Sequence, residues 1–141
     1  MKVLPLAGLL FALLTLSAGC GHVDMTPPAS ADRVLNCAVT NNTQAELPPD
    51  TEVTVRVVDV SAANGRGEVL AEETVANPPR MPVMVRVEFQ AEDAVLRRGV
   101  NVEARVAVGG KLRYMTTSAH PITTSNVNET QVIQLVTVAN R

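Results

Sequence analysis

Apolar residues occupy every second position between residues 83 and 89, and again between residues 100 and 108. Because successive side chains of a β-strand point to opposite faces, this spacing predicts strands with one buried and one polar face. Shorter runs with the same spacing lie near residues 35–39, 53–57 and 111–117, and further strands are expected near residues 69–75 and 131–138. We therefore expect an all-β domain, an antiparallel β-sandwich of about seven strands, immunoglobulin-like or transthyretin-like, with one helical turn within residues 91–98.

Aromatic residues are almost missing from the chain. They make up 2% of the sequence, as Phe11, Phe89 and Tyr114. The core must then be built mainly from Val, Leu, Ile, Ala and Met, and β-branched side chains pack well on a pleated sheet. Composition therefore favours the same fold class as the alternation.

The first residues have the order of a secretory signal. Lys2 supplies a positive charge, an apolar run follows to Leu16, and small residues then lead into Cys20. We interpret residues 1–19 as a lipoprotein signal peptide, after which Cys20 is the first residue of the mature chain and carries diacylglycerol, with palmitate-type acyl chains, on its sulfur. The alternative is an ordinary signal peptide cleaved near Ala18, with Cys20 unmodified. The apolar run is shorter than the roughly 20 residues that a membrane span needs.

The segment after the cysteine predicts a spacer. Residues 20–32 contain paired prolines and small polar residues, which are typical of a flexible tether, and residues 33–141 are expected to form a single β-sandwich domain. Gly21 follows the cysteine, where Asp often marks retention at the inner membrane in enteric bacteria. We therefore expect a lipoprotein of the outer membrane that faces the periplasm.

Two residues within the predicted strands stand out chemically. Cys37 alternates with apolar neighbours, and lipidation of Cys20 would leave it without a disulfide partner, so we expect a small buried side chain rather than a reactive thiol. Asp59 lies among valines and is expected to cap a turn through Ser61 or to hold a hydrogen bond at a β-bulge. A functional role for Asp59 is the alternative.

Catalytic and metal-binding patterns are weak. His22 and Asp24 are two possible metal ligands, fewer than a zinc site uses, on a segment expected to be flexible. Ser118 and His120 lie close in sequence, but without the glycine pattern that surrounds a nucleophilic serine. We therefore expect no catalytic residues, no metal site and no cofactor.

Charged residues are expected to be solvated. Glu72 and Glu73 would face opposite sides of a strand, so they cannot form one acid–base pair. Arg97 and Arg98 are expected to lie at a helix end, where cations are favoured, and contact with anionic lipid is the alternative. The net charge of −2 and the lack of a basic run indicate no nucleic-acid partner.

A series of short motifs runs in one order through the domain. They are Leu47-Pro48-Pro49-Asp50-Thr51-Glu52-Val53-Thr54-Val55, Val58-Asp59-Val60-Ser61, Val69-Leu70-Ala71-Glu72-Glu73, Pro82-Val83 with Val85, Ala104-Arg105-Val106, Gly109-Gly110-Lys111-Leu112 and His120-Pro121-Ile122. In order and spacing this segment resembles the YbaY/YscW family of lipoproteins. The resemblance implies a β-sandwich at the outer membrane of a Gram-negative cell. Through the family's type III secretion members, it also implies a pilotin, a small lipoprotein that escorts a secretin subunit.

These observations together predict a non-catalytic binding or chaperone module, pilotin-like, attached to the membrane through Cys20. Its expected partner is a protein such as a secretin subunit, bound at a sheet edge or in an apolar groove. The alternative is an envelope-structural or polysaccharide-associated lipoprotein with no escort role. Sugars usually stack on aromatic faces, and Phe89 and Tyr114 offer little for such a platform.

Overall fold

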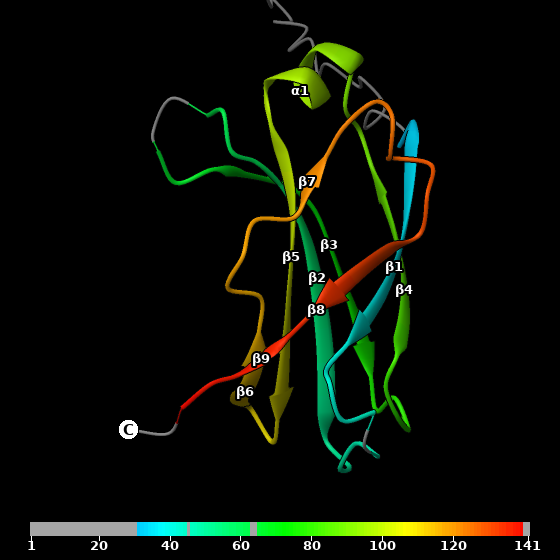
Figure 1. Cartoon of the computed structure of the whole chain (residues 1–141), viewed down its shortest axis with the longest axis vertical. Helices are drawn as coiled ribbons and strands as arrows, with labels where there is room; N and C mark the ends of the chain where they lie inside the picture. The colour runs from blue at the N-terminus through cyan, green and yellow to red at the C-terminus, as the bar shows by residue number, and fades with distance from the viewer. Residues whose placement is uncertain (1–30, 45, 63–64, 140–141) are drawn as a thin grey trace, which may run out of the picture.

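Two β-sheets face each other and enclose the core (Figure 1). The computed structural model describes residues 31–44, 46–62 and 65–139, so Cys20, His22 and Asp24 lie outside the described residues. Within the described part of the chain, no helix is long and apolar enough to cross a membrane.

The larger sheet has six strands in the order β3-β2-β5-β6-β9, with β7 pairing with the remaining part of β5. Its strands are β2 (Thr51–Asp59), β3 (Glu68–Ala76), β5 (Val100–Val108), β6 (Lys111–Met115), β7 (Pro121–Ile122) and β9 (Val136–Thr137). All their pairings are antiparallel. The predicted antiparallel β architecture is confirmed in this sheet.

The smaller sheet has three strands in the order β4-β1-β8, formed by β4 (Val83–Phe89), β1 (Arg33–Thr40) and β8 (Gln131–Gln134). β1 and β4 are antiparallel, but β1 and β8 are parallel, with Ala38 opposite Val132. The expected antiparallel β-sandwich is confirmed, with β1 and β8 as a parallel pair within it. A parallel pair needs a long crossover between its strands, and here that connection runs from β2 to β7 and includes β4 of the smaller sheet.

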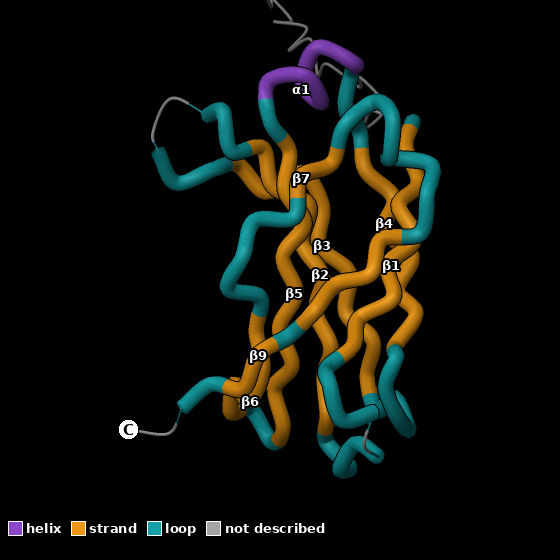
Figure 2. The backbone as a smooth tube through the Cα atoms, viewed as in Figure 1, coloured by secondary structure: helices purple, strands orange, loops and turns teal. Residues whose placement is uncertain are grey.

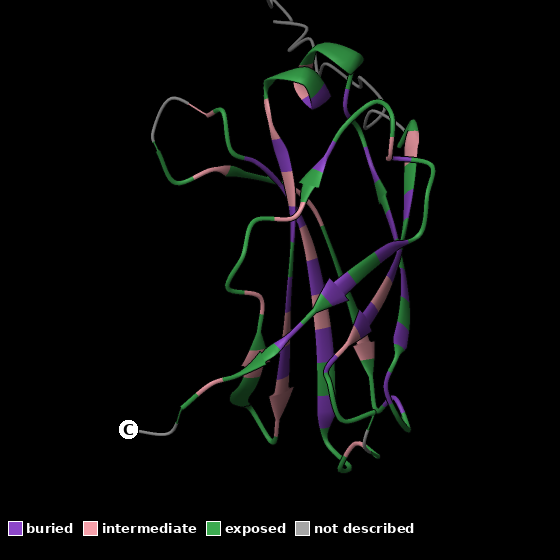
Figure 3. Cartoon of the chain, viewed as in Figure 1, coloured by how far each residue is buried: buried purple, intermediate pink, exposed green. Residues whose placement is uncertain are grey.

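Buried residues, purple in Figure 3, lie on strands of both sheets, and their side chains form the core. The alternating valines of β2, β4 and β5 point inward, and Phe89 is the largest of the fully buried side chains. Removing this apolar surface from water is the main force that holds the sheets together. The alternation therefore predicted the buried face of these strands correctly.

The last predicted strand, at residues 131–138, divides into two. β8 belongs to the smaller sheet and β9 to the larger one, and Leu135 lies between them with its side chain buried. The amide of Leu135 donates a hydrogen bond to the carbonyl of Thr40 at 2.9 Å. The chain therefore passes from one sheet to the other and joins them along one side of the sandwich, as the tube in Figure 2 shows.

The predicted helical turn is α1 (Asp93–Arg98), at one end of the sandwich. Arg97 and Arg98 lie in its last turn, as expected for cations at a helix end. Asp93 in the first turn forms an ion pair with Arg33 at the start of β1, at 2.5 Å. The helix is thereby tied to the smaller sheet.

A glycine is required where the loop between β2 and β3 returns to the sheet. Gly67 has a φ of +76°, and a Cβ atom there would lie 2.6 Å from Cγ1 of Val58. Gly65 in the same loop has a φ of +69° but would meet nothing within 4 Å. A side chain at Gly65 would cause backbone strain alone, whereas one at Gly67 would cause both backbone strain and steric overlap.

We predict that Gly67→Ala lowers the free energy of unfolding by about 2–4 kcal/mol, because strain and overlap add. Gly65→Ala, the matched control, should cost only about 1–2 kcal/mol from strain alone. Urea unfolding followed by circular dichroism measures both values. Equal losses in the two variants would contradict the proposed contact with Val58.

Candidate functional site

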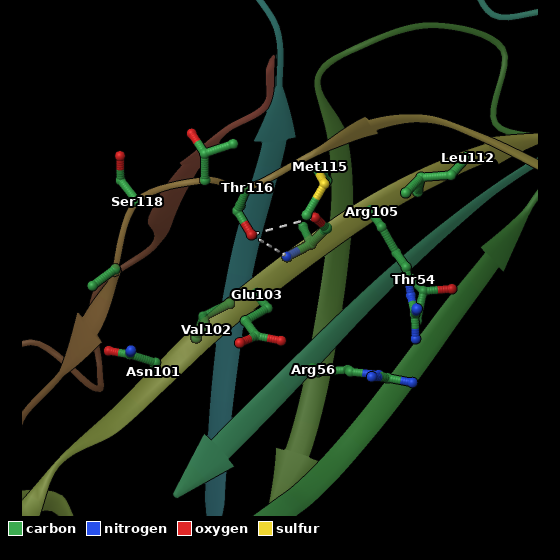
Figure 4. A pocket seen from close by; sticks show the side chains of 13 residues that line it. Thr54, Arg56, Asn101, Val102, Glu103, Arg105, Leu112, Met115, Thr116 and Ser118 are labelled. Atoms are coloured by element: carbon green, nitrogen blue, oxygen red, sulfur yellow. Dashed lines mark hydrogen bonds between the residues drawn. The ribbon is translucent and has the colours of Figure 1, made fainter. Parts of the chain in front are cut away.

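The outer face of the larger sheet is hollowed into a groove of about 340 Å³ along β5 (Figure 4). Side chains of β2 and β5 form its floor, residues 116–119 form one wall, and Leu112 and Met115 of β6 form part of its rim. A second hollow of about 300 Å³ shares Thr54, Arg105 and Leu112 with the groove and extends it toward the turn after β5. This continuous hollow is called the β5 groove below.

Strand register places one row of side chains across the floor and rim of the β5 groove. Thr74, Thr54, Arg105, Met115 and Val136 stand opposite one another on five neighbouring strands. Residues that pair directly share a face of the sheet, so all five point away from the core. The row changes from polar side chains on β3 and β2 to apolar ones on β6 and β9.

The apolar end of the groove is exposed. Leu112 and Met115 each retain 38% of their accessible surface, and Val136 retains 44%. These three neighbouring apolar side chains are exposed to water. Binding of another molecule over them would lower the free energy, because it would bury apolar surface. This end of the groove is therefore suited to an apolar partner surface.

The next row along the floor is charged and contains Glu72, Arg56 and Glu103. Nε of Arg56 donates to Oε2 of Glu72, and Nη2 of Arg105 lies 3.9 Å from the same oxygen. One carboxylate thus serves two guanidinium groups. Glu103 is exposed and, among the described residues, has no hydrogen-bond or ion-pair partner.

The wall of the β5 groove is fixed by hydrogen bonds to β5. The amide of Thr116 donates to the carbonyl of Ala104 at 2.9 Å, and the amide of Val102 donates to the carbonyl of His120 at 3.0 Å. Nε2 of His120 lies 2.9 Å from Oε1 of the buried Gln131, which itself donates to two carbonyls of the preceding loop. His120 therefore helps to hold the wall against the domain.

A regular period-two alternation over residues 111–117 would place Leu112 and Tyr114 together on the inner face of the strand, but the structure separates them. A β-bulge shifts the register between Val106 and Ala107, so that Val106 pairs with Tyr114 but Ala107 pairs with Leu112. Tyr114 packs against the core, whereas Leu112 lines the groove. A bulge adds one residue and so reverses the facing of the residues beyond it.

Cys37 and Asp59 both have structural surroundings. Cys37 is fully buried in β1, and desolvation raises the pKa of its thiol to about 12, so the thiol stays protonated at neutral pH. Oδ1 of Asp59 accepts from the amide and the hydroxyl of Ser61, at 2.9 and 2.5 Å, which is the expected turn cap. The expected bulge in β2 lies between Val57 and Val58.

The weak catalytic and metal patterns do not come together in the described part of the chain. No group of three His, Cys, Asp or Glu residues there could hold a metal ion. Ser118 lines the β5 groove, while His120 turns its Nε2 toward Gln131. Glu72 points to the outer face beside Arg56, and Glu73 stands opposite Val55, on the other face of β3.

The fold is a small β-sandwich with a groove on the outer face of its larger sheet. Its family is shown by sequence: the family model described as "Type III secretion system lipoprotein chaperone (YscW)" matches residues 30–135. The chain belongs to this YscW family, as the order of motifs predicted. No curated protein matches the chain.

A solved structure has the same fold. The protein is similar to the structure of an alternative pilotin from the type II secretion system of Vibrio cholerae, with a TM-score of 0.64 and 23% sequence identity. The similarity covers 77% of this chain and 98% of the other. At this identity the match supports the β-sandwich arrangement.

The hydrogen bonds to Asp59 lead to a prediction about acid stability. The two bonds from Ser61 and then the charge of Arg98 lower the pKa of Asp59 below its ordinary value of 3.8. A lowered pKa stabilises the folded state above pH 3.8, and this contribution disappears as the pH falls through the lower, folded-state pKa. We therefore predict that Asp59→Asn reduces stability at pH 7 and weakens its fall on acidification below about pH 4.

Urea unfolding between pH 2 and pH 7 measures this effect. Asp50→Asn is the control, because the carboxylate of Asp50 lies on an exposed turn. An identical pH dependence in wild type and Asp59→Asn would show that the Ser61 cap does not contribute.

Proposed function

We propose that this protein is a pilotin: an outer-membrane lipoprotein, attached through lipid on Cys20, that binds a segment of a secretin subunit in its β5 groove. The observation that carries the proposal is the match of residues 30–135 to a family of type III secretion system lipoprotein chaperones. The exposed apolar rim of the groove supports a protein partner. The domain acts by binding and positioning, without a chemical step.

The hydrogen bonding of the floor indicates the form of the bound segment. β2 lies between β3 and β5, while β5 is paired with β2 on one side and with β6, residues 116–120 and β7 on the other. A segment lying on this face finds side chains but few free backbone groups. A helix satisfies its own backbone, so an amphipathic helix with an apolar stripe on Leu112 and Met115 fits the groove.

The alternative role in polysaccharide binding has less support from the described residues. Phe89 is buried in the core, and Tyr114 lies on the inner side of β6 and packs against the same core. Neither ring is placed on the groove floor as a platform for a sugar. The exposed side chains of the groove are instead aliphatic, charged or hydroxyl-bearing.

We predict that deleting the gene abolishes assembly of secretin multimers in the bacterium that carries it, and that Met115→Asp fails to restore assembly. The substitution places a charge in the apolar rim, where docking would bury it. Met84→Asp is the matched control, because Met84 is 60% exposed on the smaller sheet and far from the groove floor. Heat-resistant multimers on gels measure the outcome.

Normal multimers in the deletion strain would refute the escort role. Normal multimers with Met115→Asp, combined with their loss in Met84→Asp, would place the binding site on the smaller sheet instead.

A separate prediction concerns the anchor. Cys20→Ala should abolish incorporation of radiolabelled palmitate and leave the secretin in the inner-membrane fraction, because the lipid chains supply the membrane affinity. Cys37→Ala should keep the label, since Cys37 is buried within β1. Retention of label by Cys20→Ala would contradict the assignment of the attachment site.

A further inference from the structure

Glu103 is the carboxylate of the charged row (Glu72, Arg56 and Glu103) that the neighbouring arginines leave unpaired. Glu52, nearer the turn after β5, also has no ion-pair partner among the described residues. It lies on β5 directly opposite Arg56 on β2, so a cross-strand ion pair would be expected between them. Arg56 instead donates to Glu72 on its other side, and Arg105 also approaches Glu72. Figure 4 shows the carboxylate of Glu103 on the groove floor, between Val102 and Arg56.

Docking changes the surroundings of this carboxylate. In the free protein Glu103 is exposed and hydrated, so it needs no partner. A helix that covers Leu112 and Met115 would also cover the centre of the floor, because Glu103 is two residues from Arg105, which pairs with Met115. A carboxylate that loses water without gaining a partner costs several kcal/mol.

We propose that Glu103 is the specificity-determining residue of the groove and selects a helix that carries a lysine or arginine beside its apolar stripe. This inference rests on the proposed function and states the chemistry of its partner. Two residues along a strand span about 7 Å, and four residues along a helix span about 6 Å. Helix positions three or four residues apart share one face, so the selected cation lies three or four positions from the apolar residue that contacts Met115.

The same arrangement disfavours other segments. A carboxylate at that position of the helix would face Glu103, and an apolar residue would leave Glu103 buried and unpaired. The groove thus discriminates by the unmatched charge of Glu103 beside an apolar surface.

The test uses the full-length lipidated protein in detergent and overlapping peptides, each of about 20 residues, that cover the secretin subunit of the same bacterium. Peptides that bind wild type should contain a lysine or arginine three or four positions from an apolar stripe. Glu103→Lys should weaken their binding at least tenfold by fluorescence anisotropy, since it opposes two cations. Replacing the cation of the peptide with glutamate should restore binding to Glu103→Lys.

Glu88→Lys is the matched control, since it makes the same charge change at an exposed position of the smaller sheet. It should bind within about twofold of wild type. The Met115→Asp variant tests whether a bound peptide occupies the groove.

The outcomes separate the two proposals. If no peptide binds, or if binding is unaffected by Met115→Asp, the groove is not the secretin site and the proposed function fails in that respect. If peptides bind and Met115→Asp removes binding, but Glu103→Lys changes affinity no more than Glu88→Lys, the function stands and the role of Glu103 is refuted. Binding of peptides that lack a cation near the stripe refutes it equally.

Discussion

Strand β5 is hydrogen-bonded to neighbouring strands on both sides. One of its faces contributes to the core and the other to the β5 groove. Its inward valines complete the core between the sheets, and its outward Glu103 and Arg105 form the floor of the β5 groove. Because its backbone is occupied by β2, β6, β7 and residues 116–120, the strand is held rigidly. A binding surface built on such a strand keeps its charges in fixed positions before a partner arrives.

The edges of the larger sheet favour binding at its face over strand addition. β3 is one edge, and it carries Glu68, Glu72 and Glu73 along nine residues. Glu73 points to the same side as the core valines yet remains exposed on this edge strand. Charged residues on an edge strand, especially on its inner side, hinder pairing with another chain. Of the two binding modes expected from sequence, the groove is therefore the better supported.

The positions of the strands could be predicted from the local sequence pattern, whereas the pairing of strands that are distant in sequence could not. The alternation from Val83 to Phe89 predicted both a strand and its buried side. Successive side chains of a strand point to opposite faces, so apolar residues at every second position mark the face that is buried. The division of residues 131–138 at Leu135 could not be predicted, because each half is determined by a distant partner, β1 or β6. The facing of Leu112 depended on a bulge whose register is set by β5.

The candidate site was hidden for the same reason. Its members belong to strands far apart in sequence, and each alone resembles an ordinary solvated residue: Arg56, Glu72, Glu103 and Arg105. Only the strand order places two arginines on one carboxylate and leaves the other carboxylate unmatched. An alternating pattern can therefore predict which residues face outward, while the order of the strands determines which of those outward charges is available to a partner.

The C-terminal strand completes this surface. The family match ends at residue 135, and β9 begins at Val136, where it pairs with Met115 on the free side of β6. The pairing occupies backbone groups that an extended partner would otherwise use, and it adds the aliphatic side chain of Val136 to the rim. Both effects favour binding of a helix over addition of a strand. The first removes an edge for strand addition, and the second enlarges the apolar surface that a helix can cover. The segment beyond the matched residues thus favours recognition through side chains on the face of the sheet.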